Sequence, residues 1–186
     1  MSDARPAGIA DLTRLFINIA LLRRGPEDVP ASALLLVLTI VAYVLLTLIL
    51  GAALPLAVDT RMAVIATDCF VALLWYWVVL RVAGRPERFV QTSTAVFGIQ
   101  VVIAPLFGVM RWLMLTYKDN PDWQLPAMAL MFVVSIWTLT VNARVLRSAT
   151  EWRTGFCVAL VVLQGAIGLV LALLMFPGDA PAVSTG

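Results

Sequence analysis

The sequence contains no histidine and only two cysteines. Without histidine, the chain lacks the residue that most often serves as a general base or as a metal ligand. Cys69 and Cys157 both lie inside apolar runs, whereas a disulfide framework needs more cysteines in exposed positions, so we interpret both as small packing residues. No glycine-rich phosphate loop and no pair of deep carboxylates is recognisable. We therefore expect no catalytic activity, no cofactor and no metal site.

Charged residues are also scarce. They make up 13% of the 186 residues and apolar residues make up 62%, against about 25% and about 45–50% in a typical soluble domain. This composition predicts an integral membrane protein. The net charge of +2 is dispersed along the chain, so we expect no nucleic-acid partner. The basic residues are almost all arginine, which together with frequent alanine indicates a GC-rich bacterial genome.

Five long apolar runs dominate the chain. They cover residues 32–56, 62–82, 90–115, 125–145 and 155–176. Each run approaches or exceeds the roughly 20 residues that a helix needs to cross a hydrocarbon core of about 30 Å. In lipid each run must satisfy its own backbone hydrogen bonds, so we predict five helices in an all-α membrane bundle. The predicted organisation is an N-terminal segment 1–31, a membrane domain 32–176 and a short tail 177–186.

The segment before the first run has a different pattern. Within residues 8–24, apolar side chains recur at helical spacing between charged ones, and Gly25 and Pro26 follow as a helix end. We predict an amphipathic helix that lies in the membrane interface on the cytoplasmic side. The alternative is a helix that packs on protein. We expect no cleavable signal peptide, because the first long apolar run begins only near Ala33.

The basic residues are distributed unevenly between the two ends of the predicted bundle. Ten precede the first run, or lie at the ends of the second and fourth runs and in the links that follow them: Arg5, Arg14, Arg23, Arg24, Arg81, Arg85, Arg88, Arg144, Arg147 and Arg153. The remaining three are Arg61, Arg111 and Lys118. The positive-inside rule then predicts an inner-membrane protein with a cytoplasmic N-terminus and a C-terminus on the outer side.

Three stretches resemble the Yip-type family of multi-pass membrane proteins, in its bacterial branch. "LLRRGPEDVPAS" leads into the first run, "RPERFVQTSTAVFGIQVVIAPL" enters a run that contains a proline, and "SIWTLTVNARVLRSATEWRTGFCVAL" joins two runs through a basic turn. The resemblance covers most of residues 20–176. It implies a cytoplasmic N-terminal segment and a five-span bundle. The acidic and aromatic motif of the eukaryotic, Rab-interacting members is not visible, so the resemblance implies architecture more than a partner.

One carboxylate, Asp68, stands inside the second run. Arg111 lies at a similar depth in the third run, which should be its neighbour because the link between them is short. We predict an Asp68–Arg111 pair, since a charged group at the centre of a span costs about 2.5–3.5 kcal/mol on the insertion scale. The alternative is a proton or cation site at Asp68, with Gln100 and Gln164 deeper in the bundle.

Three uncharged polar residues also lie within the runs. We predict that Gln100, Asn142 and Gln164 form hydrogen bonds between helices, each contributing about 0.6 kcal/mol. Pro105 is predicted to kink the third run, because proline removes a backbone donor from the helix.

These observations favour a non-enzymatic inner-membrane protein that scaffolds, assembles or traffics other membrane components. The expected partners are the lipid bilayer and other membrane proteins or further copies of the chain. A second hypothesis is a small transporter or channel that uses the Asp68 region. A third is a lipid-acting enzyme with its site at the cytoplasmic rim, where Glu87 and Glu151 lie.

Overall fold

The protein is described by a computed structural model that covers residues 9–52, 58–118 and 120–175. All the regular secondary structure in these ranges is helical. The elements are α1 (Ile9–Ala20), η1 (Pro26–Asp28), α2 (Ala33–Gly51), α3 (Val58–Val82), η2 (Pro86–Arg88), α4 (Phe89–Thr116), α5 (Pro121–Thr150) and α6 (Thr154–Met175).

Helices α2 to α6 coincide with the five predicted apolar runs. Each contains a stretch that is long and apolar enough to cross a membrane, which confirms the all-helical fold and the number of candidate spans. The bounds of α5 differ from the prediction: it begins at Pro121 and continues to Thr150, whereas we predicted 125–145. The predicted tail 177–186 lies outside the described residues, as does the first part of the N-terminal segment.

Local sequence signals explain where several helices begin and end. The hydroxyl of Ser32 accepts a hydrogen bond from the backbone N–H of Leu35, which caps the start of α2. At α5 the side chain of Asn120 caps the first turn and Pro121 occupies the first helical position, where its missing N–H costs nothing. The same helix ends at Glu151, which adopts a left-handed conformation with φ of 62°.

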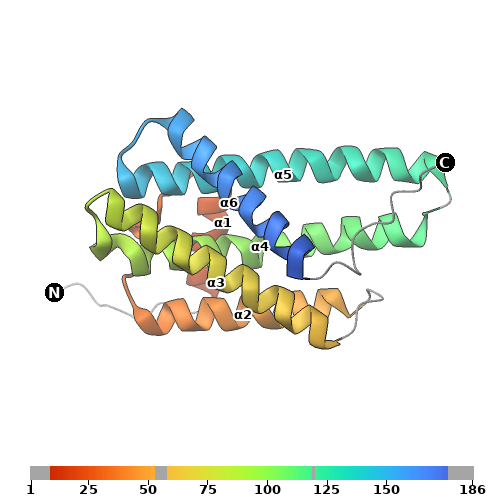
Figure 1. Ribbon diagram of the computed structural model, residues 1–186, viewed down its shortest axis with the longest axis horizontal. Helices are drawn as coiled ribbons and strands as arrows, with labels where there is room; N and C mark the ends of the chain where they lie inside the picture. Colours follow the sequence, from red (N-terminus) through yellow and green to blue (C-terminus); the bar gives the residue numbers. More distant parts are fainter. Residues whose placement is uncertain (1–8, 53–57, 119, 176–186) are drawn as a thin grey trace.

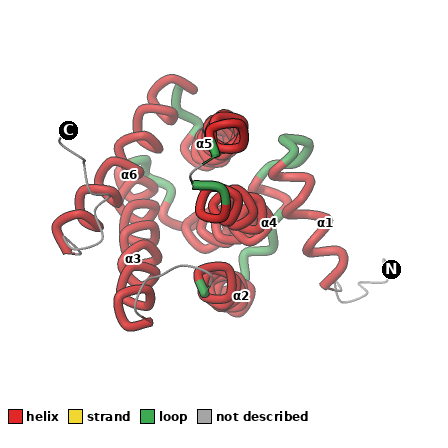
Figure 2. The backbone as a smooth tube through the Cα atoms, turned by 90° about the vertical axis from the view of Figure 1, so that its right-hand side faces the viewer, coloured by secondary structure: helices red, strands yellow, loops and turns green. Residues whose placement is uncertain are grey.

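The long helices run side by side around a central α4. Figure 2 shows α5, α4 and α2 end-on in one row, with α3 and α6 on one side of the row and α1 on the other. Helix α4 packs mainly against α2 and α5, and it also contacts α1 and α3. Every residue from Thr92 to Ile99 is buried as a result. The core is therefore concentrated in the first half of α4.

Helix α1 packs on the chain's own helices. It crosses α4 steeply, behind the other helices in Figure 1. The side chains of Phe16 and Ile19 are 7% and 1% exposed, and the indole N–H of Trp137 in α5 donates to the carbonyl of Ala20 over 3.0 Å. A Cβ at Gly98 would lie 2.3 Å from the Phe16 ring, so the ring fits only because that residue is glycine.

The packing of α1 corrects one expectation from the sequence. We predicted that the apolar face of this segment lies in lipid, whereas in the structure α4 and α5 cover it. An amphipathic pattern records only that one face avoids water, and a protein surface satisfies that pattern as well as lipid does. The structure therefore shows the apolar face of α1 packed on protein, and the position of α1 at the membrane interface stays a prediction.

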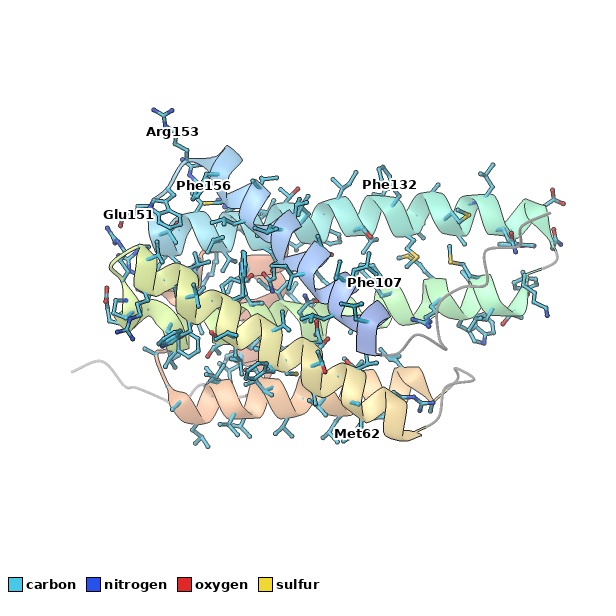
Figure 3. The ribbon with its side chains drawn as sticks, viewed as in Figure 1. Met62, Phe107, Phe132, Glu151, Arg153 and Phe156 are labelled. Carbon is cyan, nitrogen blue, oxygen red and sulfur yellow. The ribbon has the colours of Figure 1, made fainter. Side chains whose placement is uncertain are left out.

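Three chain segments meet at one end of the bundle, which we call the basic end. It consists of residues 21–32, the link 83–88 between α3 and α4, and the link 151–153 between α5 and α6. In Figure 3, Glu151 and Arg153 lie at this end and Met62 lies toward the opposite end.

Candidate functional site

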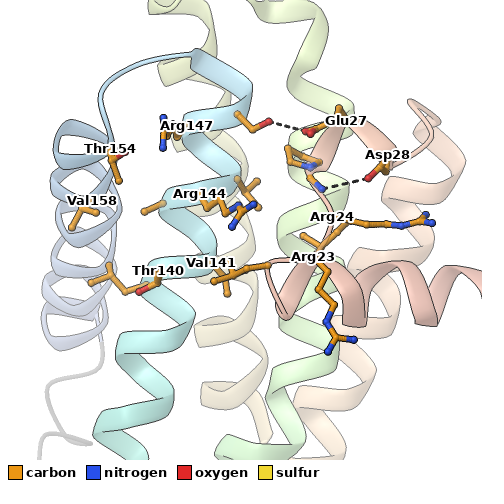
Figure 4. Close-up of a pocket in the computed structure, with 18 of the residues that line it drawn as sticks. Arg23, Arg24, Glu27, Asp28, Thr140, Val141, Arg144, Arg147, Thr154 and Val158 are labelled. Carbon is orange, nitrogen blue, oxygen red and sulfur yellow. Dashed lines mark hydrogen bonds between the residues drawn. The ribbon is translucent and has the colours of Figure 1, made fainter.

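A groove of about 1060 Å³ opens at the basic end, and we call it the basic groove. Figure 4 shows α6 on one side of it, the chain that follows α1 on the other, and α5 between them. Its polar lining comprises Arg23, Arg24, Glu27, Asp28, Thr140, Arg144, Arg147, Ser148, Glu151 and Thr154. Its apolar lining includes Ile19, Leu22, Leu139, Val141 and Val158. The groove therefore joins a charged rim to an apolar wall.

Four arginines give the groove its cationic character. Arg144 and Arg147 stand one turn apart on α5, and Arg23 and Arg24 follow α1. In Figure 4, Arg144 extends from α5 toward the N-terminal segment, whereas Arg24 points away from α5. None of the four guanidinium groups forms an ion pair with a carboxylate of the described residues.

The acidic groups of the groove are engaged by other partners. The carboxylate of Glu27 accepts a hydrogen bond of 2.7 Å from the hydroxyl of Ser148. The carboxylate of Asp28 accepts a longer bond of 3.4 Å from the backbone N–H of Gly25. Glu151 is held by two arginines that do not line the groove. These neutral donors leave Glu27 and Asp28 negatively charged, so the lining of the groove carries four positive and three negative side chains, of which Glu151 is paired with arginines outside the groove.

Hydrogen bonds to α4 hold the N-terminal wall of the groove in place. The side-chain amide of Gln91 donates to the carbonyl of Glu27 over 2.9 Å and to the carbonyl of Val29 over 2.8 Å. Val29 is 1% exposed and belongs to the main core. The wall is therefore fixed to α4 by both polar and apolar contacts.

A cluster of charges joins the two links of the basic end. The guanidinium of Arg85 binds both carboxylate oxygens of Glu151, at 2.6 and 2.5 Å, and Arg88 approaches the same carboxylate at 3.4 Å. Arg88 also donates to the carbonyls of Ser148 and Ala149, at 3.0 and 3.2 Å. These carbonyls belong to the last turn of α5, where no helical N–H reaches them. The cluster therefore fixes the α5–α6 turn against the start of α4.

Asp68 has a different partner from the one that we predicted. The hydroxyl of Tyr43 in α2 donates to its carboxylate over 2.7 Å, and no ion pair joins Asp68 to Arg111 within the described ranges. Our prediction sought a charged partner on the following helix, α4, and did not consider α2, which precedes α3. Helix α3 contacts both α2 and α4, and it is α2 that supplies the group that reaches Asp68.

Arg111 lines a smaller cavity between α2 and α4. Its volume is about 220 Å³, and Tyr43, Thr47 and Gln100 contribute polar atoms to its lining. The Thr47 hydroxyl is buried and forms no hydrogen bond in the described structure. The structure therefore brings three of the implicated residues near one another, since Tyr43 also binds Asp68 and Gln100 and Arg111 share the cavity.

The other polar residues that we singled out are not joined across helices. The side chains of Gln100 and Gln164 are half-buried and show no hydrogen bond to another described residue. Asn142 is 7% exposed, and its side-chain oxygen has no partner there. Their predicted interhelical bonds are therefore not formed in the structure. Pro105 lies inside a continuous α4, and its predicted kink stays a prediction.

Two functional features were missed from the sequence alone. We counted Arg23, Arg24, Arg144 and Arg147 as orientation signals but did not predict that they meet in one groove. The spacing of Arg144 and Arg147 places both on one side of a helix, which is a usable signal. Tyr43 was the other omission, because we searched the runs for charged groups and amides but not for phenols.

The fold fits the class of helical membrane proteins with several spans, because five of its helices have the required length and composition. Comparison with known protein families, with curated proteins and with solved structures found no match. The resemblance to the Yip-type family therefore stays a prediction.

Proposed function

We propose that the chain is a five-span protein of the bacterial inner membrane that acts as a non-enzymatic scaffold, assembly or trafficking factor. The basic end faces the cytoplasm in this proposal, because five of the 13 basic residues lie in its three segments, and Arg81, Arg144 and Arg147 lie in the helix ends that lead into them. The Yip-type resemblance supports the same architecture, with a cytoplasmic N-terminal segment ahead of the bundle.

The observation that carries the proposal is the construction of the basic end. Three segments that are distant in sequence form one surface, and it is held by the Arg85–Glu151 pair and by the Gln91 bonds to the N-terminal wall. A surface fixed in this way loses little conformational freedom on binding, which favours a partner. Exposed arginines next to apolar side chains are also typical of protein interfaces.

Site-specific photocrosslinking in native membranes tests the proposal. Glu87 is exposed at the basic end, and Met62 is 46% exposed toward the opposite end. We replace each in turn by the photoreactive residue p-benzoylphenylalanine. The proposal expects discrete protein adducts from position 87 and none from position 62. Adducts with lipid alone at both positions would contradict a scaffold.

The small cavity beside Arg111 favours a second candidate function, a transporter or channel. It connects an arginine, the side chain of Gln100 and the Tyr43–Asp68 hydrogen bond within the apolar bundle. Ionisable groups inside a membrane bundle commonly belong to ion or proton pathways. Proteoliposomes test this function: a proton or cation flux that disappears in Asp68→Asn while the variant still folds supports it, and the absence of flux in the wild type rejects it.

A further inference from the structure

We propose that the basic groove binds the phosphate-bearing headgroup of an anionic phospholipid from the cytoplasmic leaflet. This inference rests on the orientation given under the proposed function, and it identifies a class of ligand at the basic end. The charge of the groove, its apolar wall and its size support it independently.

The first support is the arrangement of charge. Arg144 and Arg147 are like charges one turn apart on α5, a spacing at which they repel each other. Neither is paired with a carboxylate of the described residues, while the nearby Glu27 accepts from Ser148. In Figure 4, Arg144 extends toward the N-terminal segment and Arg147 toward α6. A phosphate bound at either guanidinium offsets this like charge and accepts charge-assisted hydrogen bonds, since the planar guanidinium fork matches phosphate oxygens.

The second support is the apolar wall, which decides between a lipid and a free anion. The half-buried side chains of Leu139 on α5 and Val158 on α6 line the same groove as the arginines. Along α5 and α6 the apolar surface continues with exposed Ile136 and Val162. A free phosphate gains nothing from such a wall, whereas the acyl chain of a lipid covers it once the headgroup is bound.

The third support is the space available. Pockets that enclose a small ligand have volumes of about 300–1,000 Å³. At about 1060 Å³ the basic groove has room for a headgroup together with the first part of its chains. Basic pockets between helices on the cytoplasmic side are sites where anionic lipid headgroups bind in other membrane proteins.

Lipid retention by the purified full-length chain tests the proposal. The protein is washed in mild detergent with mixed micelles of phosphatidylglycerol and phosphatidylcholine, and the bound lipid is quantified. The wild type is expected to retain phosphatidylglycerol selectively. The Arg144→Gln/Arg147→Gln variant should bind it about tenfold more weakly or worse, because the charge-assisted contacts are lost.

Arg153→Gln is the matched control. Arg153 lies at the same end and carries the same charge, but it points out of the bundle in Figure 3 and does not line the groove. The control should retain phosphatidylglycerol as the wild type does. Two results would overturn the proposal: the double variant retains as much phosphatidylglycerol as the wild type, or Arg153→Gln loses as much as the double variant. Either result shows that binding does not depend on the groove.

A second measurement needs no variant and covers the case in which the double variant fails to fold. Phosphatidylglycerol should raise the melting temperature of the wild-type protein, while phosphatidylcholine and inorganic phosphate should not. Protection by inorganic phosphate at the same concentration would reject a lipid as the source of the phosphate. No protection by phosphatidylglycerol would reject the site itself.

The outcome is separable from that of the scaffold proposal. A protein with selective lipid retention but no protein adduct at position 87 has the lipid site and is not a scaffold. A protein adduct at position 87 without selective lipid retention would support the scaffold and reject the lipid site.

Discussion

The basic end and the opposite half of the bundle handle buried or crowded charge in different ways. At the basic end, Arg85 and Arg88 share one carboxylate of Glu151, and the arginines of the groove remain open to a ligand. In the opposite half Asp68, which lies inside α3, is joined to the phenol of Tyr43 by one hydrogen bond. Water and headgroups screen charges at the basic end, whereas charges within the bundle depend on a neighbouring helix.

This difference separates a region suited to binding a partner, the basic end, from a region whose contacts stabilise the fold, the opposite half. At the basic end, the arginines of the groove form no ion pair within the described residues, so they remain available to a partner. In the opposite half, the carboxylate of Asp68 accepts a hydrogen bond from a neutral donor, the hydroxyl of Tyr43. Substitutions in the two regions should therefore affect different properties, and three experiments sharpen or break the comparison.

The largest effect on stability is expected at the contact between α1 and α4. Gly98→Val places a side chain where even a Cβ would lie 2.3 Å from the ring of Phe16, which is itself 7% exposed. Overpacking of this kind costs about 1–3 kcal/mol. We expect a lower melting temperature and faster proteolysis of residues 9–32, measured in mild detergent.

Gly165→Val is the matched control for this substitution. Gly165 lies in α6, and a Cβ there would meet no atom within 4 Å among the described residues. Adding Phe16→Ala to Gly98→Val should restore protection of the N-terminal segment, because the smaller side chain leaves room. Equal proteolysis in Gly98→Val and the control would show that α1 is not docked at Gly98.

A smaller effect is expected for the charge cluster of the basic end. Glu151→Gln removes the ion pairs with Arg85 and Arg88, whose side chains are 29% and 35% exposed, while that of Glu151 is 58% exposed. Because the pairs are partly screened, we expect a loss of about 0.5–1 kcal/mol at low salt and less at high salt. Unfolding measured at two salt concentrations provides the comparison.

Glu87→Gln serves as the control for the cluster, because Glu87 is an exposed acid of the same links that forms no ion pair with a described residue. It should unfold as the wild type does at both salt concentrations. A Glu151→Gln variant that behaves in the same way would mean that the cluster does not hold the α5–α6 turn.

The smallest effect is expected in the opposite half. A double-mutant cycle between Tyr43→Phe and Asp68→Ala should give a coupling of about 0.6 kcal/mol, which is the average for a hydrogen bond between membrane helices. A cycle between Arg111→Gln and Asp68→Ala should give almost none, since these residues do not pair. Stronger coupling to Arg111 than to Tyr43 would restore the pair that we predicted from the sequence.

Much of the fold was predictable because it follows from local requirements. A chain in lipid must satisfy its backbone hydrogen bonds within each segment, so an apolar run of sufficient length indicates a helix wherever the run packs. The five helices could therefore be found from the sequence. Gly25 and Pro26 did not mark the end of the first helix, because α1 ends at Ala20, before both of them.

Apart from the bounds of α1 and α5, the errors concern which surfaces meet. Asp68 was assigned to Arg111 because their helices are joined by a short link, but α3 also contacts α2, and Tyr43 of α2 reaches the acid instead. Helix α1 was assigned to lipid because its pattern does not distinguish lipid from protein. The basic groove escaped notice because the N-terminal segment and α5 are distant in sequence, and only folding brings their arginines together.

The central claim is that the basic end of a five-span bundle faces the cytoplasm, and labelling of single introduced cysteines tests it most directly. Arg153→Cys reports on the basic end and Asn120→Cys on the opposite end, while the native Cys69 and Cys157 are both buried. In spheroplasts, a membrane-impermeant maleimide should label Asn120→Cys at once and Arg153→Cys only after lysis. Labelling of Arg153→Cys before lysis would contradict the account.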